Sequence, residues 1–256
     1  MLLATFALWR RDVVRFYRQR SRIIGALGTP VVFWLLLGSG LGRSFHAVSG
    51  VAPDGGYLEY FYPGTLALIL LFTAIFSTIS VIEDRHEGFL QGVLVAPVPR
   101  SAIVLGKILG GTTLALMQAA VFLLLAPFAN MSIGLASLPM MMIVLGTLGF
   151  ALTGLGFMLA WLLDSTQGFH AVMNLFLLPM WLLSGAVFPR AGAAEWIQWV
   201  MLINPMTYGV AAIRGVLVSG DVVGAGASVG SSLMFIVLFG AITLAISTAS
   251  VRYRRV

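Results

Sequence analysis

The stretch YFYPGTLALILLFTAIFSTISVI, residues 60–82, decides the fold class, because it runs for 23 residues without a charged side chain. A helix needs roughly 20 apolar residues to cross a hydrocarbon core about 30 Å thick. Residues 60–82 are therefore predicted to form a transmembrane helix. Glu83, Asp84 and Arg85 follow at once, so this helix is expected to leave the membrane at a charged loop.

The composition of the whole chain points to a membrane location. Of its 256 residues, 59% are hydrophobic and 9% are charged, with a mean hydropathy of +1.00. A typical soluble domain has about 25% charged residues. A chain with so little polar surface has to place its apolar excess against lipid, which predicts an all-α integral membrane protein. The absence of cysteine excludes disulfides, thiolate metal ligands and cysteine nucleophiles.

Five further apolar runs are long enough to cross a membrane. The sequence thus predicts one membrane domain over residues 1–256 with six transmembrane helices, and an even number of crossings places both chain ends on the same side. The six predicted spans are residues 23–42, 60–82, 108–129, 138–163, 169–188 and 229–249.

The distribution of Lys and Arg indicates which side that is. The N-terminal segment, the loop 83–107 and the C-terminal tail together hold twelve of these residues, whereas the opposite face holds Arg43, Arg190 and Arg214. By the positive-inside rule, both ends and the loop 83–107 are cytoplasmic. Topology accounts for the net charge of +6, and since no nucleic-acid motif is present we expect no nucleic-acid partner.

The N-terminal segment 1–22 is predicted to be an amphipathic interfacial helix. Its apolar residues recur at helical spacing, and arginines follow the same rhythm on roughly the opposite face. The arginines are expected among anionic headgroups and the aromatic stripe in the acyl boundary; the alternative is a juxtamembrane topology signal with no further role. The apolar stripe comprises Leu2, Phe6, Trp9, Val13 and Phe16, and the basic stripe Arg11, Arg15, Arg18 and Arg22.

The region 189–228 does not read as a simple loop. Pro189 ends the fifth span, and the following residues show apolar periodicity with Trp196, Trp199 and Tyr208 at interface-like positions. We expect two short helices that re-enter the outer leaflet, joined by non-helical backbone at Asn204-Pro205 that has to pack against protein or water.

Polar residues within the spans are few. No Asp, Glu, Lys or Arg lies in the middle of a predicted span, which disfavours an ion-coupled transporter. Gln118, His170 and Asn174 are candidate contacts along a substrate path, although such residues often serve as interhelical hydrogen-bond partners. The GxxxG spacings at Gly38/Gly42 and Gly106/Gly110 favour close helix packing or dimerisation.

Catalytic and cofactor motifs give no support for an enzyme. The G-x-S-x-G match at residues 226–230 lies before a membrane span and lacks the strand that a nucleophile elbow needs. Gly106-Lys107 lacks the earlier glycine and the following Ser or Thr of a phosphate-binding loop. The three histidines fall at different depths, so no metal cluster is expected. We therefore expect no catalytic, cofactor-binding or metal-ligating residue in this chain.

Two signatures resemble the ABC-2 family of membrane permease subunits of ATP-binding-cassette transporters. The first is E-D-R-x-E-G-x(7)-APVPR-x(4)-LGK at residues 83–107, and the second is LPMWLLSGAVFP with WIQWVMLINPMTYGVAAIR at residues 178–214. Together with the helix order, the resemblance covers nearly the whole chain. Gln91 departs from the pattern, because a carboxylate is common at that position.

The resemblance implies a partner and a coupling element. Such permeases dimerise, and each binds a separate cytoplasmic ATPase through a coupling helix between the second and third spans. ATP and Mg are expected in that partner subunit. Here that helix is expected to begin near Glu83, run to about Val95 and end at Pro97 and Pro99. Its acidic residues would lie near the helix N-terminus, where negative charge is favoured. The predicted coupling residues are Glu83, Asp84, Arg85, Glu87, Gly88 and Gln91.

The resemblance also implies a function. The chain is expected to be the non-catalytic permease subunit of an exporter in the bacterial inner membrane, which moves a drug, a lipid or a lipid-linked glycan. Arg100 and Lys107 would mark re-entry at the membrane face. Two alternatives stay open: an ion-coupled secondary transporter of a small amphiphile, and a solvated 83–107 loop without a partner.

Overall fold

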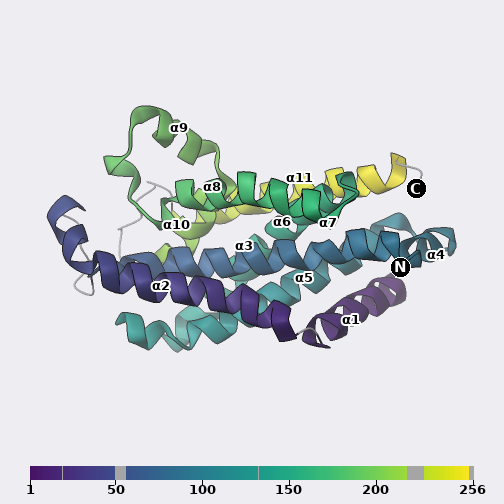
Figure 1. Ribbon diagram of the computed structural model, residues 1–256, viewed down its shortest axis with the longest axis horizontal. Helices are drawn as coiled ribbons and strands as arrows, with labels where there is room; N and C mark the ends of the chain where they lie inside the picture. The colour runs from purple at the N-terminus through teal and green to yellow at the C-terminus, as the bar shows by residue number, and fades with distance from the viewer. Residues whose placement is uncertain (19, 50–55, 132, 218–227, 254–256) are drawn as a thin grey trace.

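The computed structural model describes the chain except residues 19, 50–55, 132, 218–227 and 254–256, and every regular element in the described part is helical (Figure 1). The long elements are α1 (Leu2–Arg18), α2 (Arg20–Ser49), α3 (Gly56–His86), α5 (Arg100–Leu123), α6 (Leu138–Leu162) and α11 (Val229–Tyr253). The shorter α-helices are α4 (Phe89–Val95), α7 (Thr166–Val172), α8 (Leu178–Trp181), α9 (Glu195–Ile203) and α10 (Pro205–Leu217). The remaining turns are η1 (Ala126–Ala129), η2 (Leu135–Ser137), η3 (Met173–Leu177), η4 (Leu182–Ala186) and η5 (Arg190–Gly192).

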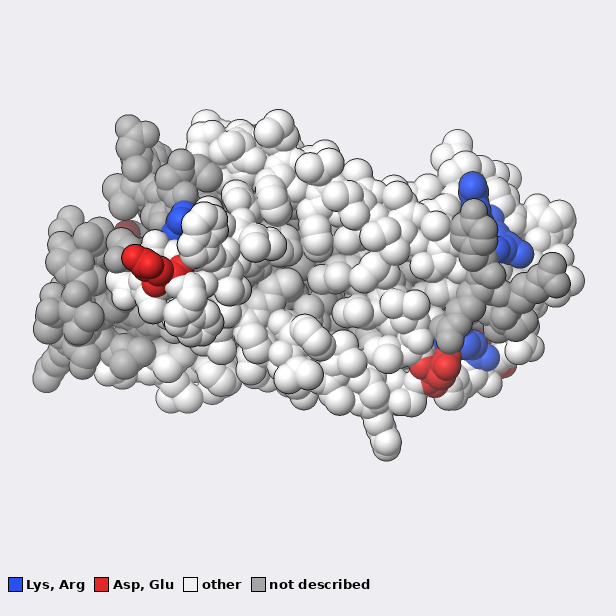
Figure 2. Space-filling view, turned by 90° about the horizontal axis from the view of Figure 1, so that it is seen from above, with Lys and Arg blue, Asp and Glu red and all other residues white. Residues whose placement is uncertain are grey.

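Five stretches of the described chain are long and apolar enough to cross a membrane, and each overlaps a predicted span. The third, predicted as 108–129, begins earlier, at Arg100, and ends at Leu123. The first predicted span, 23–42, lies within α2, whose apolar part Leu27–Gly40 is shorter. The long helices run mostly along the long axis, and the start of α1 and the end of α11 lie at the same end of the molecule as α4 (Figure 1). Charged side chains gather at the two ends of the face drawn in Figure 2, with an uncharged band between them. The five stretches are Gly56–His86, Arg100–Leu123, Leu135–Leu162, Thr166–Ala186 and Val229–Arg252.

Helix α3, which contains the run 60–82, lies at the centre of the bundle. It packs against α2, α5 and α6, and Phe61, Leu66 and Ile69 on it are completely buried. Lipid tails are as apolar as leucine, so this burial stabilises the bundle through van der Waals packing rather than through release of water. The apolar run that predicts a span therefore also supplies the core.

Helix α1 packs along α5, and the Gly106/Gly110 spacing serves this contact within one chain. A Cβ built on Gly106 would lie 2.9 Å from Leu8 Cβ, and one on Gly110 would lie 3.4 Å from Asp12 Cβ. Trp9 Nε1 donates to Thr113 Oγ1 at 3.0 Å in the same contact. The two glycines thus let α1 approach α5 closely.

The apolar stripe of α1 was predicted to face lipid, and not all of its residues are free to do so. The residues of α1 that are buried against the protein are Leu8, Asp12 and Phe16, whereas Leu2 and Phe6 are 85% and 57% exposed. Phe16 therefore contacts protein instead of the acyl boundary. The expected place of α1 at the headgroup layer stays a prediction.

The fifth predicted span is not one regular helix. Two π-helical turns, η3 and η4, interrupt it, and Gly185 in η4 has a φ of 80°. Such turns leave carbonyl groups without helical partners, which is costly inside hydrocarbon. Asn204 Nδ2 donates to the carbonyls of Met180 and Leu183 at 2.5 and 3.0 Å, and Tyr60 Oη donates to that of Gly185 at 3.0 Å.

The two helices expected after this break are α9 and α10, and their axes bend by 82° between Ile203 and Pro205. Asn204 between them has extended backbone, as the sequence predicts, and its side chain is 7% exposed. Its Oδ1 accepts a hydrogen bond from the backbone N–H of Met206 at 2.9 Å. One buried amide therefore holds both the bend and the broken span.

Candidate functional site

The predicted coupling helix is shorter than expected and begins later. Helix α3 continues to His86, the chain turns at Glu87 and Gly88, and α4 covers only Phe89–Val95. Gly88 has a φ of 75°, in the left-handed region that glycine adopts without steric cost. The expectation of one helix from Glu83 to Val95 was wrong, because this glycine separates two helices.

This correction reverses the electrostatic argument for the acidic residues. Glu83 and Asp84 lie in the last turns of α3, at a helix C-terminus, where the helix dipole disfavours negative charge. Their carboxylates therefore need cations from elsewhere in the chain. Arg11 and Arg15 of α1 and Lys107 of α5 supply them.

Asp84 is the centre of this arrangement, and its side chain is completely buried. Arg11 donates two hydrogen bonds to its carboxylate, at 2.8 and 2.6 Å, and Arg15 donates one at 2.8 Å. Lys107 Nζ donates to Asp84 Oδ2 at 2.5 Å. A buried carboxylate is tolerated only when it is paired and hydrogen-bonded in this way, so Asp84 ties α1, α3 and α5 together.

Lys107 is buried within the bundle, because its side chain is only 3% exposed. Besides Asp84, its ammonium group contacts the carboxylate of Asp12 at 3.0 Å and Ser80 Oγ at 3.2 Å. Burial raises the pKa of the Asp12 carboxyl above its ordinary value, and the charge of Lys107 opposes that rise. Two carboxylates thus share one ammonium group.

Two arginines of α1 that were expected among lipid headgroups, Arg11 and Arg15, contact the turn before α4 and the first residue of α4. The Arg15 guanidinium lies 3.1 Å from both Glu83 and Glu87. The Arg11 guanidinium lies over the ring of Phe89, 3.6 Å from its centroid, a cation–π contact. Helix α1 therefore touches the end of α3, the turn and the first residue of α4. We call Arg11, Asp12, Arg15, Glu83, Asp84, Glu87 and Lys107 the charge cluster.

Arg85 contacts the loop between α6 and α7. It donates to Asp164 Oδ1 at 2.8 Å and to the carbonyl of Trp161 at 3.0 Å. His86 Nε2 lies 2.8 Å from the carbonyl oxygen of Asp164. The end of α3 therefore contacts the α6–α7 loop in addition to α1 and α5.

Arg100 at the start of α5 contacts the end of α11. Its Nη1 donates to the carbonyls of Val251 and Arg252 at 3.0 and 2.5 Å. A cation at this position both satisfies terminal carbonyls and complements the helix dipole. The segment from α3 to α5 is thus held by α1, by the α6–α7 loop and by α11.

Helix α4 has one buried and one exposed side. Leu90 is 2% exposed and packs into the core, whereas Val95 is 88% exposed. Gly88, Gln91 and Gly92 are also exposed. Positions 91, 92 and 95 have the spacing of one helix face, so the outward face of α4 is formed by small or uncharged side chains.

Four members of the charge cluster were not recognised as site residues from the sequence: Arg11, Asp12, Arg15 and Lys107. One available signal was Asp12, which is the sole acidic residue in the segment 1–22 and lies four positions from both Leu8 and Phe16. That spacing places a carboxylate on an apolar helix face, where it needs a partner.

The three predicted substrate-path residues lie in different surroundings. Gln118 is buried between α3 and α5, where Thr73 Oγ1 donates to its Oε1 at 2.7 Å. His170 and Asn174 are exposed, and the His170 ring lies 5.8 Å from the ring of Phe76. Their role along a path stays a prediction. Among the described residues, no three His, Asp or Glu side chains are placed to hold a metal ion.

The sequence matches a known protein family and resembles several known proteins. Residues 4–218 match the family described as ABC-2 type transporter. The chain is similar to Nodulation protein J of Rhizobium leguminosarum bv. trifolii, with 28% identity over 251 residues that cover 97% of this chain and 92% of the relative. It is also similar to a protein of Cyanophora paradoxa named as a transport permease, ycf38, with 27% identity over 211 residues that cover 82% and 72%. A permease of Escherichia coli K12 named as a multidrug ABC transporter permease, YbhR, is 27% identical over 157 residues, 61% of this chain and 43% of the relative.

Proposed function

This chain belongs to the ABC-2 type transporter family, and we propose that it is the membrane subunit of an exporter driven by ATP that a separate cytoplasmic subunit hydrolyses. The family membership makes it a multi-pass membrane transport component with an ABC ATPase as its partner. The export direction, the cargo and the coupling residues are our proposals.

The observation that carries the proposal is the outward face of α4. Its exposed residues, Gln91, Gly92 and Val95, form a short projection without charge, which suits a groove on another protein. Its other side is fixed to the bundle by Leu90 and by the Arg11–Phe89 contact. Force applied to α4 would therefore be passed to the helices rather than absorbed by a flexible loop.

The charge cluster supports a mechanism for this transfer. When the ATPase binds ATP with Mg and closes, it would push α4 and the turn at Gly88. Asp84 joins α3, α5 and α1 through three cations, so these helices would move as a unit. In a dimer of two permease copies, this movement would change the cavity between them from inward to outward access.

The cargo we propose is amphiphilic: a drug, a lipid or a lipid-linked glycan. No Asp, Glu, Lys or Arg lies in the middle of a predicted span, which suits such a molecule better than an ion, and one relative is named as a multidrug permease. Gln118, His170 and Asn174 are the polar residues that we assign to its path. We place the complex in the bacterial inner membrane, in contact with its lipids.

The absence of cysteine makes a direct test possible. Gln91→Cys and Val95→Cys, labelled with a photoreactive maleimide in membranes that contain the complete complex, should cross-link to the ATPase. Leu135→Cys is a matched control, because Leu135 is 86% exposed but precedes α6, away from α4. If Gln91 and Val95 label only lipid or water while the ATPase co-purifies, α4 is not the docking element and the coupling proposal fails.

A further inference from the structure

The arginines of α1 fall into two sets that the sequence does not distinguish. Arg11 and Arg15 reach toward α3 and pair with its carboxylates. Arg10 and Arg18 are exposed, and in the described part of the chain neither of them forms an ion pair. Two of the four guanidinium groups are therefore committed to the charge cluster, and two are available to a ligand.

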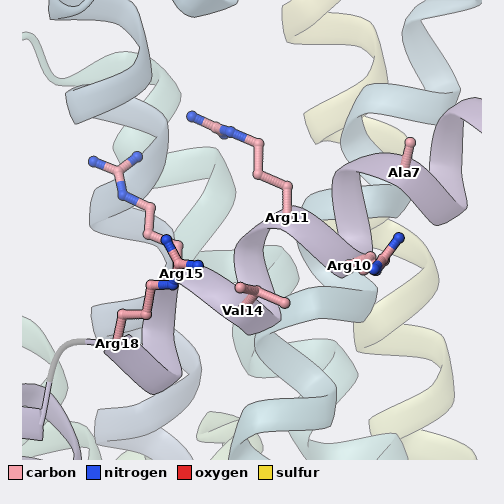
Figure 3. A pocket seen from close by; sticks show the side chains of 6 residues that line it. All are labelled: Ala7, Arg10, Arg11, Val14, Arg15 and Arg18. Atoms are coloured by element: carbon pink, nitrogen blue, oxygen red, sulfur yellow. The ribbon is translucent and has the colours of Figure 1, made fainter.

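The two available arginines lie at either end of a hollow on the outer face of α1. The hollow has a volume of about 600 Å³, and Figure 3 shows Val14 between Arg10 and Arg18 along the helix. Its lining residues are Ala7, Arg10, Arg11, Val14, Arg15 and Arg18. None of them is acidic, and the carboxylates that Arg11 and Arg15 bind are not among the lining residues.

We propose that this hollow binds the phosphate group of an anionic phospholipid. Arg10, Val14 and Arg18 are spaced by four residues, so the two arginine Cα atoms lie about 12 Å apart along one helix face. Guanidinium groups bind phosphate oxygens through paired N–H donors. Val14, which is 43% exposed, provides an apolar surface between them for the glycerol and the first acyl carbons.

The surroundings of the hollow favour a lipid over an acidic protein. Leu2 and Leu3 on α1 are 85% and 87% exposed, and Phe6 and Tyr17 are 57% and 46% exposed. A protein partner that offers carboxylates would leave these apolar side chains in water. A phospholipid contacts both the arginines and the apolar side chains, because its phosphate binds the guanidinium groups and its acyl chains pack against the apolar residues. Helix α2, which leads to the apolar Leu27–Gly40, also begins directly after α1.

The proposal predicts a lipid preference that can be measured on the purified complex by native mass spectrometry. The titration uses phosphatidylglycerol, with phosphatidylcholine as the reference that has a phosphate but, because of its choline cation, no net charge. A basic side chain near an anionic surface contributes about 1 kcal/mol, so each arginine should account for roughly a fivefold change in affinity. Arg10→Gln with Arg18→Gln should weaken phosphatidylglycerol binding about 25-fold, while phosphatidylcholine binding stays the same.

Two controls separate a site from general electrostatics and from misfolding. Arg252→Gln removes another exposed arginine, at the end of α11, and should leave the affinity unchanged. Arg10→Lys with Arg18→Lys keeps both charges and should retain most of the binding, even if the glutamine pair proves difficult to purify. Inorganic phosphate should not displace the lipid at concentrations where phosphatidylglycerol competes.

Three results would overturn the proposal. The glutamine pair could bind phosphatidylglycerol as tightly as the wild type does, or Arg252→Gln could weaken binding equally. Alternatively, the glutamine pair could lose the ATPase on co-purification while its lipid affinity is unchanged, which would assign the hollow to a protein partner. Because lipid binding is read separately from ATPase recovery, failure here is distinguishable from failure of the proposed function.

Discussion

Lys107 on α5 donates a 2.5 Å hydrogen bond to Asp84 on α3, and both side chains are buried. These are the two helices that α4 connects. The ion pair therefore closes the base of the α3–α4–α5 segment, and α1 covers it through Arg11, Asp12 and Arg15. Such a pair need not stabilise the fold relative to apolar residues, but removing one partner leaves the other charge buried alone.

The first prediction compares the two carboxylates that share Lys107. Asp84→Asn should be strongly destabilising, by about 3–5 kcal/mol, because it leaves three cations without their central counter-charge. Asp12→Asn should cost clearly less, since Asp12 contacts Lys107 at 3.0 Å and Arg11 at 3.5 Å, and burial already raises the pKa of its carboxyl. Thermal unfolding of the purified chain in detergent measures the loss of stability in each of the two variants.

A mutant cycle provides the control for this comparison. Lys107→Met combined with Asp84→Asn should be less destabilised than the sum of the two single variants, since both members of the pair are then neutral. Equal losses for Asp84→Asn and Asp12→Asn, together with additive effects in the cycle, would contradict a central role for Asp84.

The sequence was sufficient to locate the long apolar helices but not to assemble the charged end of the bundle around α4. Apolar length is a local property, so the run 60–82 predicts its helix without knowledge of its neighbours. The contact between Lys107 and Asp12 joins residues 95 positions apart, and no local pattern encodes such a pairing. The Gly106/Gly110 spacing signals close approach but does not say whether the approaching helix belongs to the same chain or to a second copy.

Gly88 illustrates a signal that was present but misread. Glycine near the end of a helical pattern is a common stop signal, yet Glu83 to Val95 was expected to form one helix because the first proline follows at position 97. The two-helix arrangement turns Glu83 and Asp84 toward α1 and α5 and leaves α4 short. The exact partners of each charge depend on this turn.

The second prediction concerns that turn. Gly88→Ala places a Cβ on a residue with a φ of 75°, which costs about 1–2 kcal/mol. A Cβ at position 88 would meet nothing within 4 Å, so the whole cost is backbone strain. We expect ATP-driven transport by the complex to fall while the ATPase still co-purifies, because in the proposed mechanism the turn transmits force and does not form the docking surface.

Gly92→Ala is the matched control for this prediction. Gly92 also has nothing within 4 Å of a built Cβ, but it lies inside α4 with ordinary helical backbone. Alanine there should be neutral or slightly stabilising, and Gly88→Asn should be tolerated better than Gly88→Ala. Wild-type transport by the Gly88→Ala variant would show that the left-handed turn is unimportant.

The third prediction tests whether α1 is held against α5 through Gly106. A built Cβ there lies 2.9 Å from Leu8 Cβ and 3.1 Å from the carbonyl oxygen of Thr5, so Gly106→Val should displace α1 at a cost of about 1–3 kcal/mol. Thr5→Cys with Ala102→Cys, introduced into the cysteine-free chain, reports the contact by oxidative cross-linking, because Thr5 Oγ1 lies 3.5 Å from the Ala102 carbonyl.

Gly106→Val should reduce the yield of this cross-link. Gly146→Val should leave it unchanged, since a Cβ on Gly146 would lie 3.8 Å or more from its nearest neighbour, Leu116. If the Gly106→Val chain cross-links as efficiently as the parent, α1 does not depend on the glycine surface of α5.

The fourth prediction concerns the opposite end of the molecule. Asn204→Ala removes the donor to the carbonyls of Met180 and Leu183 within the broken span, and removes the acceptor for the N–H of Met206. These groups then have no water available inside hydrocarbon, so the variant should lose about 1–2 kcal/mol of stability. Tyr60→Phe should cost less, because Arg214 Nη2 still donates to the carbonyl of Gly185 at 3.2 Å. We expect thermal unfolding in detergent to show Asn204→Ala as the least stable protein, Tyr60→Phe as intermediate and the wild type as the most stable. If Tyr60→Phe is less stable than Asn204→Ala, the tyrosine and not the amide at the bend holds the break in the fifth span.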